Sequence, residues 1–287
     1  MVHERFIEKV WKSRPTMEGA GVRLSRAFGF YEVPLFDPFL LLDDFGSNNP
    51  DDYVRGFPWH PHRGIETITY MIAGEVQHGD SLGNKGTIGT GDVQWMTAGS
   101  GIIHEEMPQR QEDMMAGFQL WANLPSADKM MHPRYRDIRS DAIPEVELGQ
   151  SAKVKIISGE LDSVKGPVQD VVTDPEYLDV TVNPNSQFRH RIDRDHTVFA
   201  YVFEGEAFFD VDLTKLSGLK NVILFGDGEE VLVTTEDEHV RFLLISGRPI
   251  QEPVAWRGPI VMNTNEELQV AFEEYRNGTF IKHERGE

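Results

Sequence analysis

The sequence predicts an all-β protein built from two similar halves. Short segments rich in β-branched and aromatic residues recur along the chain, and glycine or proline turns separate them. Many short strands at close spacing with such turns are typical of a β-sandwich or β-barrel. Residues 70–75 and 201–206 also resemble each other in residue type. This similarity indicates a duplicated β-domain.

The first half supplies a series of candidate strands. Residues 66–72 are rich in β-branched and aromatic side chains and stop at Ala73-Gly74. Pro125 ends the last strand of this half. The other candidates are residues 76–78, 87–90, 93–96, 102–107 and 117–124. Glycine-containing turns between them predict a compact series of antiparallel strands.

A connecting segment separates the two halves. Residues 126–150 lack a sustained apolar run and contain Pro133 and Pro144, as connecting segments often do. The candidate strands of the second half are residues 153–157, 197–206, 221–225, 230–234 and 240–247. We therefore predict an N-terminal domain over residues 1–135, a linker over 136–150 and a C-terminal domain over 151–287.

One helix is predicted near the end of the chain. Thr264 and Glu267 have the spacing of a capping box, in which each side chain bonds to the other residue's backbone. Gly278 can end the helix. The apolar residues at helical spacing are Leu268, Ala271, Phe272 and Tyr275. Their common face predicts that the helix packs against the protein.

The charge of the chain argues against nucleic-acid binding. The 287 residues carry a formal net charge of −19, and a field of this sign repels phosphate backbones. The densest basic stretch, residues 189–194, is interleaved with Asp193 and followed by Asp195. We therefore expect no direct contact with nucleic acid.

Composition also limits the location of the protein and its metal chemistry. No run approaches the roughly 18 apolar residues of a membrane span, and the N-terminal residues do not resemble a signal peptide. We expect a cytoplasmic protein that does not bind membranes. The chain has no cysteine, so a protein-bound metal must use His, Asp, Glu or backbone oxygen ligands.

Two short motifs place metal-ligating residues at the spacing of β-strands. His60 and His62 flank a proline, and His104 precedes Glu106 by two positions. Side chains at positions i and i+2 of a strand share a face, so neighbouring strands would bring three imidazoles and one carboxylate together. An isolated histidine is usually a hydrogen-bonded core residue, but the joint pattern predicts a metal site. A β-bulge would exchange Glu106 for Glu105.

The residues around these motifs resemble known families. Gly56, the His-x-His pair, Glu66 and Gly74 resemble the first cupin motif, and residues 91–104 resemble the second. The resemblance is closer to the pirin family, over nearly the whole chain. The stretches that carry it are residues 60–64, 94–99, 103–108, 252–254, 258–264 and 275–280. The resemblance implies two tandem cupin barrels of the RmlC-like jelly-roll type with a few short helices.

The pirin resemblance implies that His60, His62, His104 and Glu106 bind one divalent transition metal. We expect Fe(II), although these ligand types also accept Mn, Ni, Co, Cu or Zn. Such a set leaves two positions of an octahedral ion open for substrate and dioxygen. A structural zinc site would instead be closed and tetrahedral.

Glu66 lies where many cupins have a carboxylate ligand. It follows His62 by four residues, so an unbroken strand would point it inward. The resemblance implies a hydrogen-bonding partner of the site, and Glu66 is also a candidate general base. Arg63 either pairs with an acid or attracts an anionic substrate. The residues that could line a pocket for an aromatic substrate are Phe57, Trp59, Arg63, Met96 and Trp121.

The second half lacks the same ligand pattern. His190 and His196 do not have His-x-His spacing, and the later strands supply only His239 beside Glu238. We predict that the C-terminal barrel binds no metal. Its role would then be packing, oligomer contacts or partner binding.

The resemblance implies a metal-dependent dioxygenase of the quercetin 2,3-dioxygenase type. Such an enzyme opens the ring of a flavonol, or of a related enolic aromatic compound, with dioxygen and releases carbon monoxide. Its partners would be a small aromatic substrate and dioxygen. The alternative is a metal- or redox-sensing regulatory protein that binds a transcription factor or a metabolic enzyme. Metal catalysis without redox chemistry also stays open.

Overall fold

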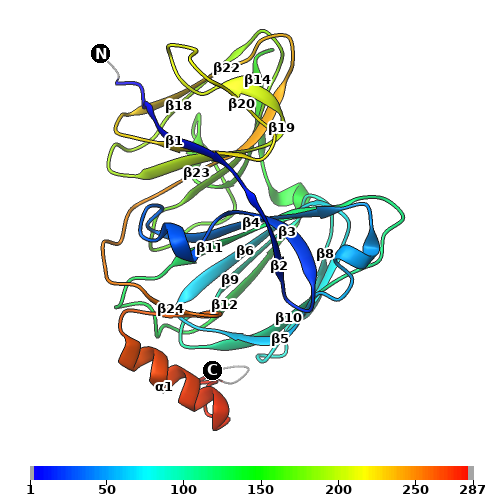
Figure 1. The fold of residues 1–287 in the computed structure, drawn as a ribbon, viewed down its shortest axis with the longest axis vertical. Coiled ribbons are helices and arrows are strands. Elements are labelled where there is room, and N and C mark those ends of the chain that lie inside the picture. The colour runs from blue at the N-terminus through cyan, green and yellow to red at the C-terminus, as the bar shows by residue number, and fades with distance from the viewer. Residues whose placement is uncertain (1–2, 284–287) are drawn as a thin grey trace. The chain divides into compact units, whose positions relative to one another are not determined.

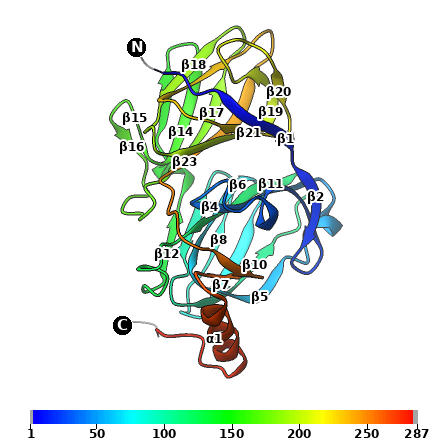
Figure 2. The ribbon, with the colours of Figure 1, turned by 60° about the vertical axis from the view of Figure 1, so that its left-hand side comes forward.

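The computed structural model describes residues 3–283 and has the predicted all-β architecture (Figures 1 and 2). The chain forms two compact units. The first unit comprises residues 14–140 and 250–283, and the second unit comprises residues 3–13 and 141–249. Within residues 3–283, no helix has the length and apolar character that crossing a membrane requires.

Eleven strands from residues 14–140 form two antiparallel sheets in the first unit. They are β2 (Arg14–Glu18), β3 (Val22–Phe28), β4 (Phe39–Ser47), β5 (Phe57–His62), β6 (Ile65–Ala73), β7 (Val76–Asp80), β8 (Lys85–Ile88), β9 (Val93–Thr97), β10 (Ile102–Pro108), β11 (Met115–Asn123) and β12 (Arg134–Ile138). Two short 3₁₀ turns, η1 (Phe30–Glu32) and η2 (Pro50–Asp52), interrupt them. The larger sheet has the order β12-β9-β6-β11-β4-β3-β2, and the smaller has the order β5-β10-β7-β8.

The two sheets of the first unit pack face to face. One cluster of buried apolar side chains joins Met71 and Met115 of the larger sheet to Val76 and Ile88 of the smaller. This is the layered arrangement expected when each sheet has one apolar face. The space between the sheets therefore holds the core and, at one end, the polar residues of the candidate site.

The C-terminal segment belongs to the first unit, which differs from the predicted domain boundary. It contains β24 (Ala255–Arg257), β25 (Ile260–Met262) and α1 (Asn265–Arg276). The Arg63 side chain donates to the Ser100 and Phe280 carbonyl oxygens at 2.7 and 2.9 Å and pairs with Glu274 at 2.7 Å. These buried contacts hold the segment on the first unit.

The predicted C-terminal helix is present as α1, and both hydrogen bonds of the capping box form between Thr264 and Glu267. Leu268 and Ala271 are buried. They belong to an apolar cluster with Ile260 and Met262 of β25. The helix is therefore a packing element of the first unit.

The second unit is built around one branched ten-stranded sheet. Its elements are β1 (Ile7–Lys12), η3 (Ser140–Ala142), β13 (Glu145–Leu148), β14 (Ala152–Ser158), β15 (Glu160–Leu161), β16 (Val164–Lys165), β17 (Glu176–Val182), β18 (Gln187–Arg191), β19 (Thr197–Phe208), β20 (Leu216–Gly218), β21 (Asn221–Phe225), β22 (Glu230–Thr234) and β23 (Val240–Gly247). The main path is β1-β21-β19-β23-β17-β14-β13, and β18 pairs with β22. The β15–β16 hairpin forms a separate two-stranded sheet.

Two strands of the second unit lie outside the predicted C-terminal domain. Strand β1 pairs with β21 along residues 7–12, so the start of the chain completes this sheet. Strand β13, inside the predicted linker, pairs with β14. The alternation in residues 145–148 is too short to predict a strand by itself, and pairing with β14 stabilises it.

Candidate metal centre

Strands β5 and β10 lie side by side and bring the predicted histidines together. His104 is opposite His60 in the antiparallel register, and Ile102 is opposite His62. Candidate ligand atoms of His60, His62 and His104 lie within 4.8 Å of one another. The expected convergence of the three imidazoles is therefore present.

Hydrogen bonds fix the orientation of two of the imidazoles. The carbonyl oxygens of Pro58 and Pro259 can only accept, so His60 Nδ1–H donates to the first at 2.9 Å and His62 Nδ1–H donates to the second at 3.0 Å. In the neutral tautomers that these bonds favour, the two Nε2 atoms, 3.0 Å apart, carry lone pairs. Lone pairs on these atoms are what a metal ion requires.

The electrostatic environment keeps the buried imidazoles neutral. Burial lowers the pKa of His62 well below its usual value, and the neighbouring His60 adds to this effect. Burial likewise lowers the pKa of His104, and His62 and His60 contribute further. Both rings are therefore available as neutral ligands at neutral pH.

His104 provides the test of whether the site fits a metal. Both of its ring nitrogens are buried without a hydrogen-bond partner among the residues that the structure describes. Buried polar atoms are nearly always paired, and His60 and His62 present two further neutral nitrogens within reach of the same point. The residues present fit a divalent transition metal, for which imidazole is a preferred ligand.

Glu106 lies on the same buried face of β10 as His104, but its oxygens are outside the group formed by the three imidazoles. The pairing between β10 and β5 shifts register between His104 and Glu106, which alters the simple alternation. The carboxylate accepts from Thr69 Oγ1 at 3.1 Å and from Gln119 Nε2 at 3.2 and 3.3 Å. Its role as the fourth ligand stays a prediction.

A cavity of about 660 Å³ opens beside His60 and His62. Its aromatic wall continues from the metal cluster: the Trp121 ring lies 5.1 Å from the His62 ring and 5.7 Å from the Trp256 ring. The other residues that line the cavity are Glu18, Gly19, Ala20, Arg26, Phe30, Leu41, Asp43, Phe57, Pro58, Gln119, Gly258 and Pro259. Phe57 and Trp121 were predicted to line a pocket, and both do.

The other three predicted pocket residues lie elsewhere. Met96 is fully buried in an apolar core cluster. Trp59 points to the opposite face of β5 from His60 and is 48% exposed. Arg63 is buried against the C-terminal segment, with its guanidinium 4.2 Å from the centre of the Phe280 ring. These contacts tie Arg63 to the C-terminal segment, and it does not line the cavity beside His60 and His62.

Glu66 does not face the imidazoles, which corrects the prediction of a general base or a hydrogen-bonding partner of the site. Gly64, with φ of +78°, breaks the strand between His62 and Glu66. The spacing of four residues therefore does not place the two side chains on the same face. Thr69, which bonds to Glu106, lies three positions after Glu66 on unbroken β6 and so on the opposite face. Glu66 instead accepts from Thr97 Oγ1 at 2.6 Å, and burial raises its pKa.

Sequence reasoning missed the contribution of the C-terminal segment and a buried network behind His104. His78 lies opposite Glu106 in the ladder, and its Nδ1 is hydrogen-bonded to the Tyr135 hydroxyl. Burial and the charge of Asp137 raise the pKa of Tyr135, which stays a phenol. No motif predicts this network, because its members come from β7 and β12. For the C-terminal segment, the only signals were the family-like stretches at residues 252–254, 258–264 and 275–280.

Strands β18 and β22 of the second unit place apolar side chains in the core of that unit. Strands β18 and β22 pair so that Phe188 is opposite Val233 and His190 is opposite Val231. Phe188 and both valines belong to the core cluster of this unit. His190 is also buried, and its Nε2 contacts Glu176 Oε1 at 3.1 Å.

Comparisons with known proteins agree with the geometry. Residues 21–122 match the family model described as Pirin, and residues 177–281 match the model of the pirin C-terminal cupin domain. A pirin-like protein of Caulobacter vibrioides is 42% identical over 278 residues, covering 96% of this chain and 99% of its own. Pirin-1 of Arabidopsis thaliana is 41% identical over 277 residues, covering 95% and 93%.

A solved structure shows the same fold. The crystal structure of quercetin 2,3-dioxygenase from Acinetobacter baumannii matches with a TM-score of 0.89 and 32% sequence identity, covering 96% of this chain and 98% of the other. Similarity of this extent covers both units and their connections. The chain therefore belongs to the pirin family of two-domain cupin proteins.

Proposed function

We propose that this protein is a metal-dependent dioxygenase of the quercetin 2,3-dioxygenase type, acting on a flavonol or a related enolic aromatic ring. The observation that carries the proposal is the cluster of three imidazoles, two of which line a cavity with aromatic walls. Its volume of about 660 Å³ is within the range of small-molecule sites. The similarity to the Acinetobacter baumannii enzyme supports this reaction class.

His60, His62 and His104 would hold the metal ion, and Glu106 is the proposed fourth ligand. We expect Fe(II), since imidazole and carboxylate together suit this ion. When bound, the ion would supply Lewis acidity and a common point of attachment for substrate and dioxygen.

The aromatic residues of the cavity would orient the substrate. Trp121 lies between the His62 ring and the Trp256 ring, so a flat aromatic compound can pack on indole surface while its oxygens face the histidines. Stacked or edge-to-face packing of such rings adds roughly 0.5–1.5 kcal/mol beyond the area that it buries. The wall therefore favours planar substrates.

An enolic hydroxyl must lose its proton on binding, and Glu106 is the proposed acceptor in place of Glu66. Its Oε2 accepts only the Gln119 hydrogen bond, whereas Oε1 also accepts from Thr69. Gln119 Nε2 thus holds the carboxylate while Oε2 keeps a lone pair for the proton.

The test is aerobic turnover of quercetin by the iron-loaded, full-length protein. Loss of flavonol absorbance, the mass of the ring-opened product and carbon monoxide would be measured together. We expect turnover by the natural chain and none above background by the double variant His60→Ala/His62→Ala. His239→Ala, which changes a half-exposed histidine of the second unit, is the control and should retain turnover. Unchanged turnover in the double variant would show that the metal mechanism is wrong.

A further inference from the structure

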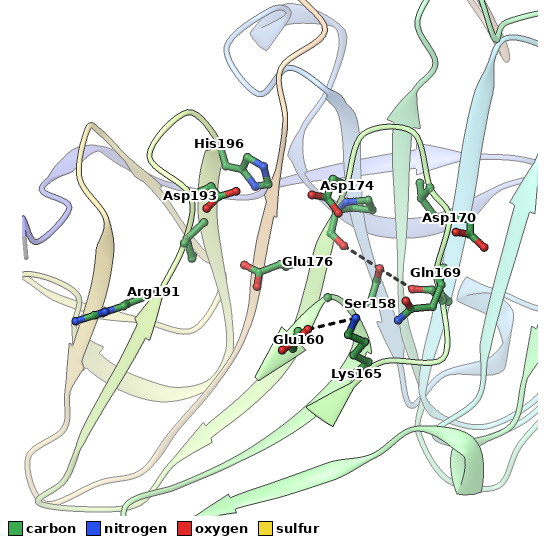
Figure 3. A pocket seen from close by; sticks show the side chains of 15 residues that line it. Ser158, Glu160, Lys165, Gln169, Asp170, Asp174, Glu176, Arg191, Asp193 and His196 are labelled. Carbon is green, nitrogen blue, oxygen red and sulfur yellow. Dashed lines mark hydrogen bonds and ion pairs between the residues drawn. The ribbon is translucent and has the colours of Figure 1, made fainter. Parts of the chain in front are cut away.

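We propose that the second unit carries a separate binding site for a divalent transition metal, formed by Asp193, Asp195 and His196. Candidate ligand atoms of the three residues lie within 4.8 Å of one another. They belong to the turn between β18 and β19, and Figure 3 shows His196 beside Asp193 at the edge of a pocket. One imidazole and two carboxylates suit ions such as Mn(II), Fe(II) and Zn(II). The proposal does not depend on the function of the first unit.

His196 is the observation that points to a ligand. The residue is only 7% exposed to solvent. Its Nε2 is buried without a hydrogen-bond partner among residues 3–283. A buried ring nitrogen without a partner is rare in native proteins. A cation held between this nitrogen and the exposed carboxylates of Asp193 and Asp195 would satisfy it.

A chain of hydrogen bonds determines which nitrogen of His196 carries the proton. Ser246 Oγ donates its one proton to Glu176 Oε2 at 2.9 Å. The Ser246 hydroxyl oxygen can therefore only accept from any further partner. His196 Nδ1 lies 3.5 Å from this oxygen and is the donor to it. Nε2 is then the deprotonated nitrogen. Partners of this kind orient the ligating histidines of metal sites.

The backbone of the turn is held in place from the start of the chain. The buried Arg5 guanidinium donates to the Asp193 and Arg194 carbonyl oxygens at 2.7 and 3.3 Å. The His196 N–H also donates to the Asp193 carbonyl oxygen at 3.0 Å. The two aspartates and the histidine are therefore presented by a fixed turn, which reduces the entropy lost when an ion binds.

The surrounding charges favour a cation. Asp193 and His196 line a cavity of about 630 Å³. Its other acidic residues are Glu160, Asp170, Asp174 and Glu176. Of its two basic residues, Lys165 pairs with Glu160 at 3.6 Å, and Arg191 is largely exposed (Figure 3). An excess of carboxylates raises the local concentration of cations, which opposes the repulsion from Arg5.

This site departs from the prediction of a metal-free second barrel. That prediction was based on the absence of a His-x-His pair on the candidate strands of the second half. The proposed ligands instead come from three of the four positions 193–196 in a turn, outside the paired strands β18 and β22. A strand template does not detect them.

The test is equilibrium dialysis of the metal-free, full-length protein against Mn(II), with bound and free ion counted by electron paramagnetic resonance. We expect two ions per natural chain at saturation. The variant Asp193→Asn/Asp195→Asn should bind one ion, and His60→Ala/His62→Ala should also bind one, at the second-unit site. Ser246→Ala should weaken the second-unit site by roughly tenfold or more.

The matched control is Asp212→Asn/Asp237→Asn, which makes the same charge change at two exposed positions of the second unit. It should leave both ions bound. The proposal is overturned if Asp193→Asn/Asp195→Asn binds as many ions as the natural chain, if His60→Ala/His62→Ala binds none, or if the control loses an ion as well. The last outcome would indicate diffuse attraction by surface charge.

Discussion

His104 is the residue whose surroundings depend most on a bound ion. Both ring nitrogens are buried without partners in the described part of the chain. A bound ion would therefore stabilise the folded protein relative to the unfolded chain. A divalent metal at a hundred times its Kd should raise the free energy of unfolding by about 2.7 kcal/mol. Urea unfolding with and without metal, under anaerobic conditions for Fe(II), measures this gain. When Asp193→Asn/Asp195→Asn also removes the proposed second-unit site, the further change His104→Ala should abolish most of this gain, and an unchanged gain would place the ion elsewhere.

Gln119 tests the role of Glu106. Its Nε2 is the donor that contacts both carboxylate oxygens, at 3.2 and 3.3 Å. If Glu106 is a ligand, Gln119→Leu should weaken metal binding at the first unit by about 10–100-fold, because partners of ligands orient them. Gln77→Leu, at an exposed position of β7, is the control. Metal affinity that is the same in both variants would exclude the ligand role of Glu106.

Arg63 tests how the C-terminal segment is held. Removing this buried cation leaves the Ser100 and Phe280 carbonyl oxygens without their donor, and Glu274 keeps only its pair with Lys282. Arg63→Met should lower the free energy of unfolding by about 3 kcal/mol or more. Arg110→Met, at a pair with exposed side chains, should have little effect. Equal denaturation midpoints for the two variants would contradict the structural role.

At the scale of elements, Lys129 joins three parts of the first unit. Its ammonium donates to the Gly64 carbonyl oxygen at 2.9 Å, to Asn123 Oδ1 at 2.7 Å and to the Val261 carbonyl oxygen at 3.2 Å. The β5–β6 turn, the end of β11 and β25 are thereby connected. Burial lowers the pKa of Lys129 to about 8, which makes the connection dependent on pH.

The direction in which stability changes with pH follows from the pKa of Lys129, which is lower in the folded protein than the 10.5 of the free side chain. Below about pH 8 both states hold the proton, and the cost of burying the charge is constant. Between about pH 8 and 10.5 the unfolded chain binds more protons, so this group's contribution to stability rises with pH. The rise amounts to about 3 kcal/mol at most. The difference in unfolding free energy between the natural chain and Lys129→Met should therefore grow over this range, and a constant difference would contradict the shift.

The two histidine-bearing strands could be predicted because each motif, His60-x-His62 and His104-x-Glu106, lies within a few consecutive residues. His60 and His62 share a face of β5, as period-two alternation requires, and His104 lies opposite His60 on β10. Glu66 could not be placed this way, because Gly64 interrupts the strand and resets the alternation. The close approach of the Val261 carbonyl oxygen, 2.0 Å from where a Cβ of residue 64 would lie, explains the glycine and is not visible in the sequence.

At the scale of the molecule, the all-β fold and its duplication were predictable, but the assignment of the chain ends was not. Residues 3–13 complete the sheet of the second unit, and residues 250–283 join the first unit. Both assignments depend on pairings between positions far apart in the sequence, such as β1 with β21. Trp256 and Pro259 were missed as parts of the cavity for the same reason.

The central claim is that one ion and one planar substrate meet in the first unit. Anomalous diffraction from crystals of the metal-loaded, full-length protein, soaked with quercetin without oxygen, tests it most directly. We expect an ion bound by His60, His62 and His104, with Glu106 as the fourth ligand and the flavonol against Trp121 and Trp256 in the adjoining cavity. An ion absent from the three imidazoles, or a flavonol bound away from that ion, would contradict it.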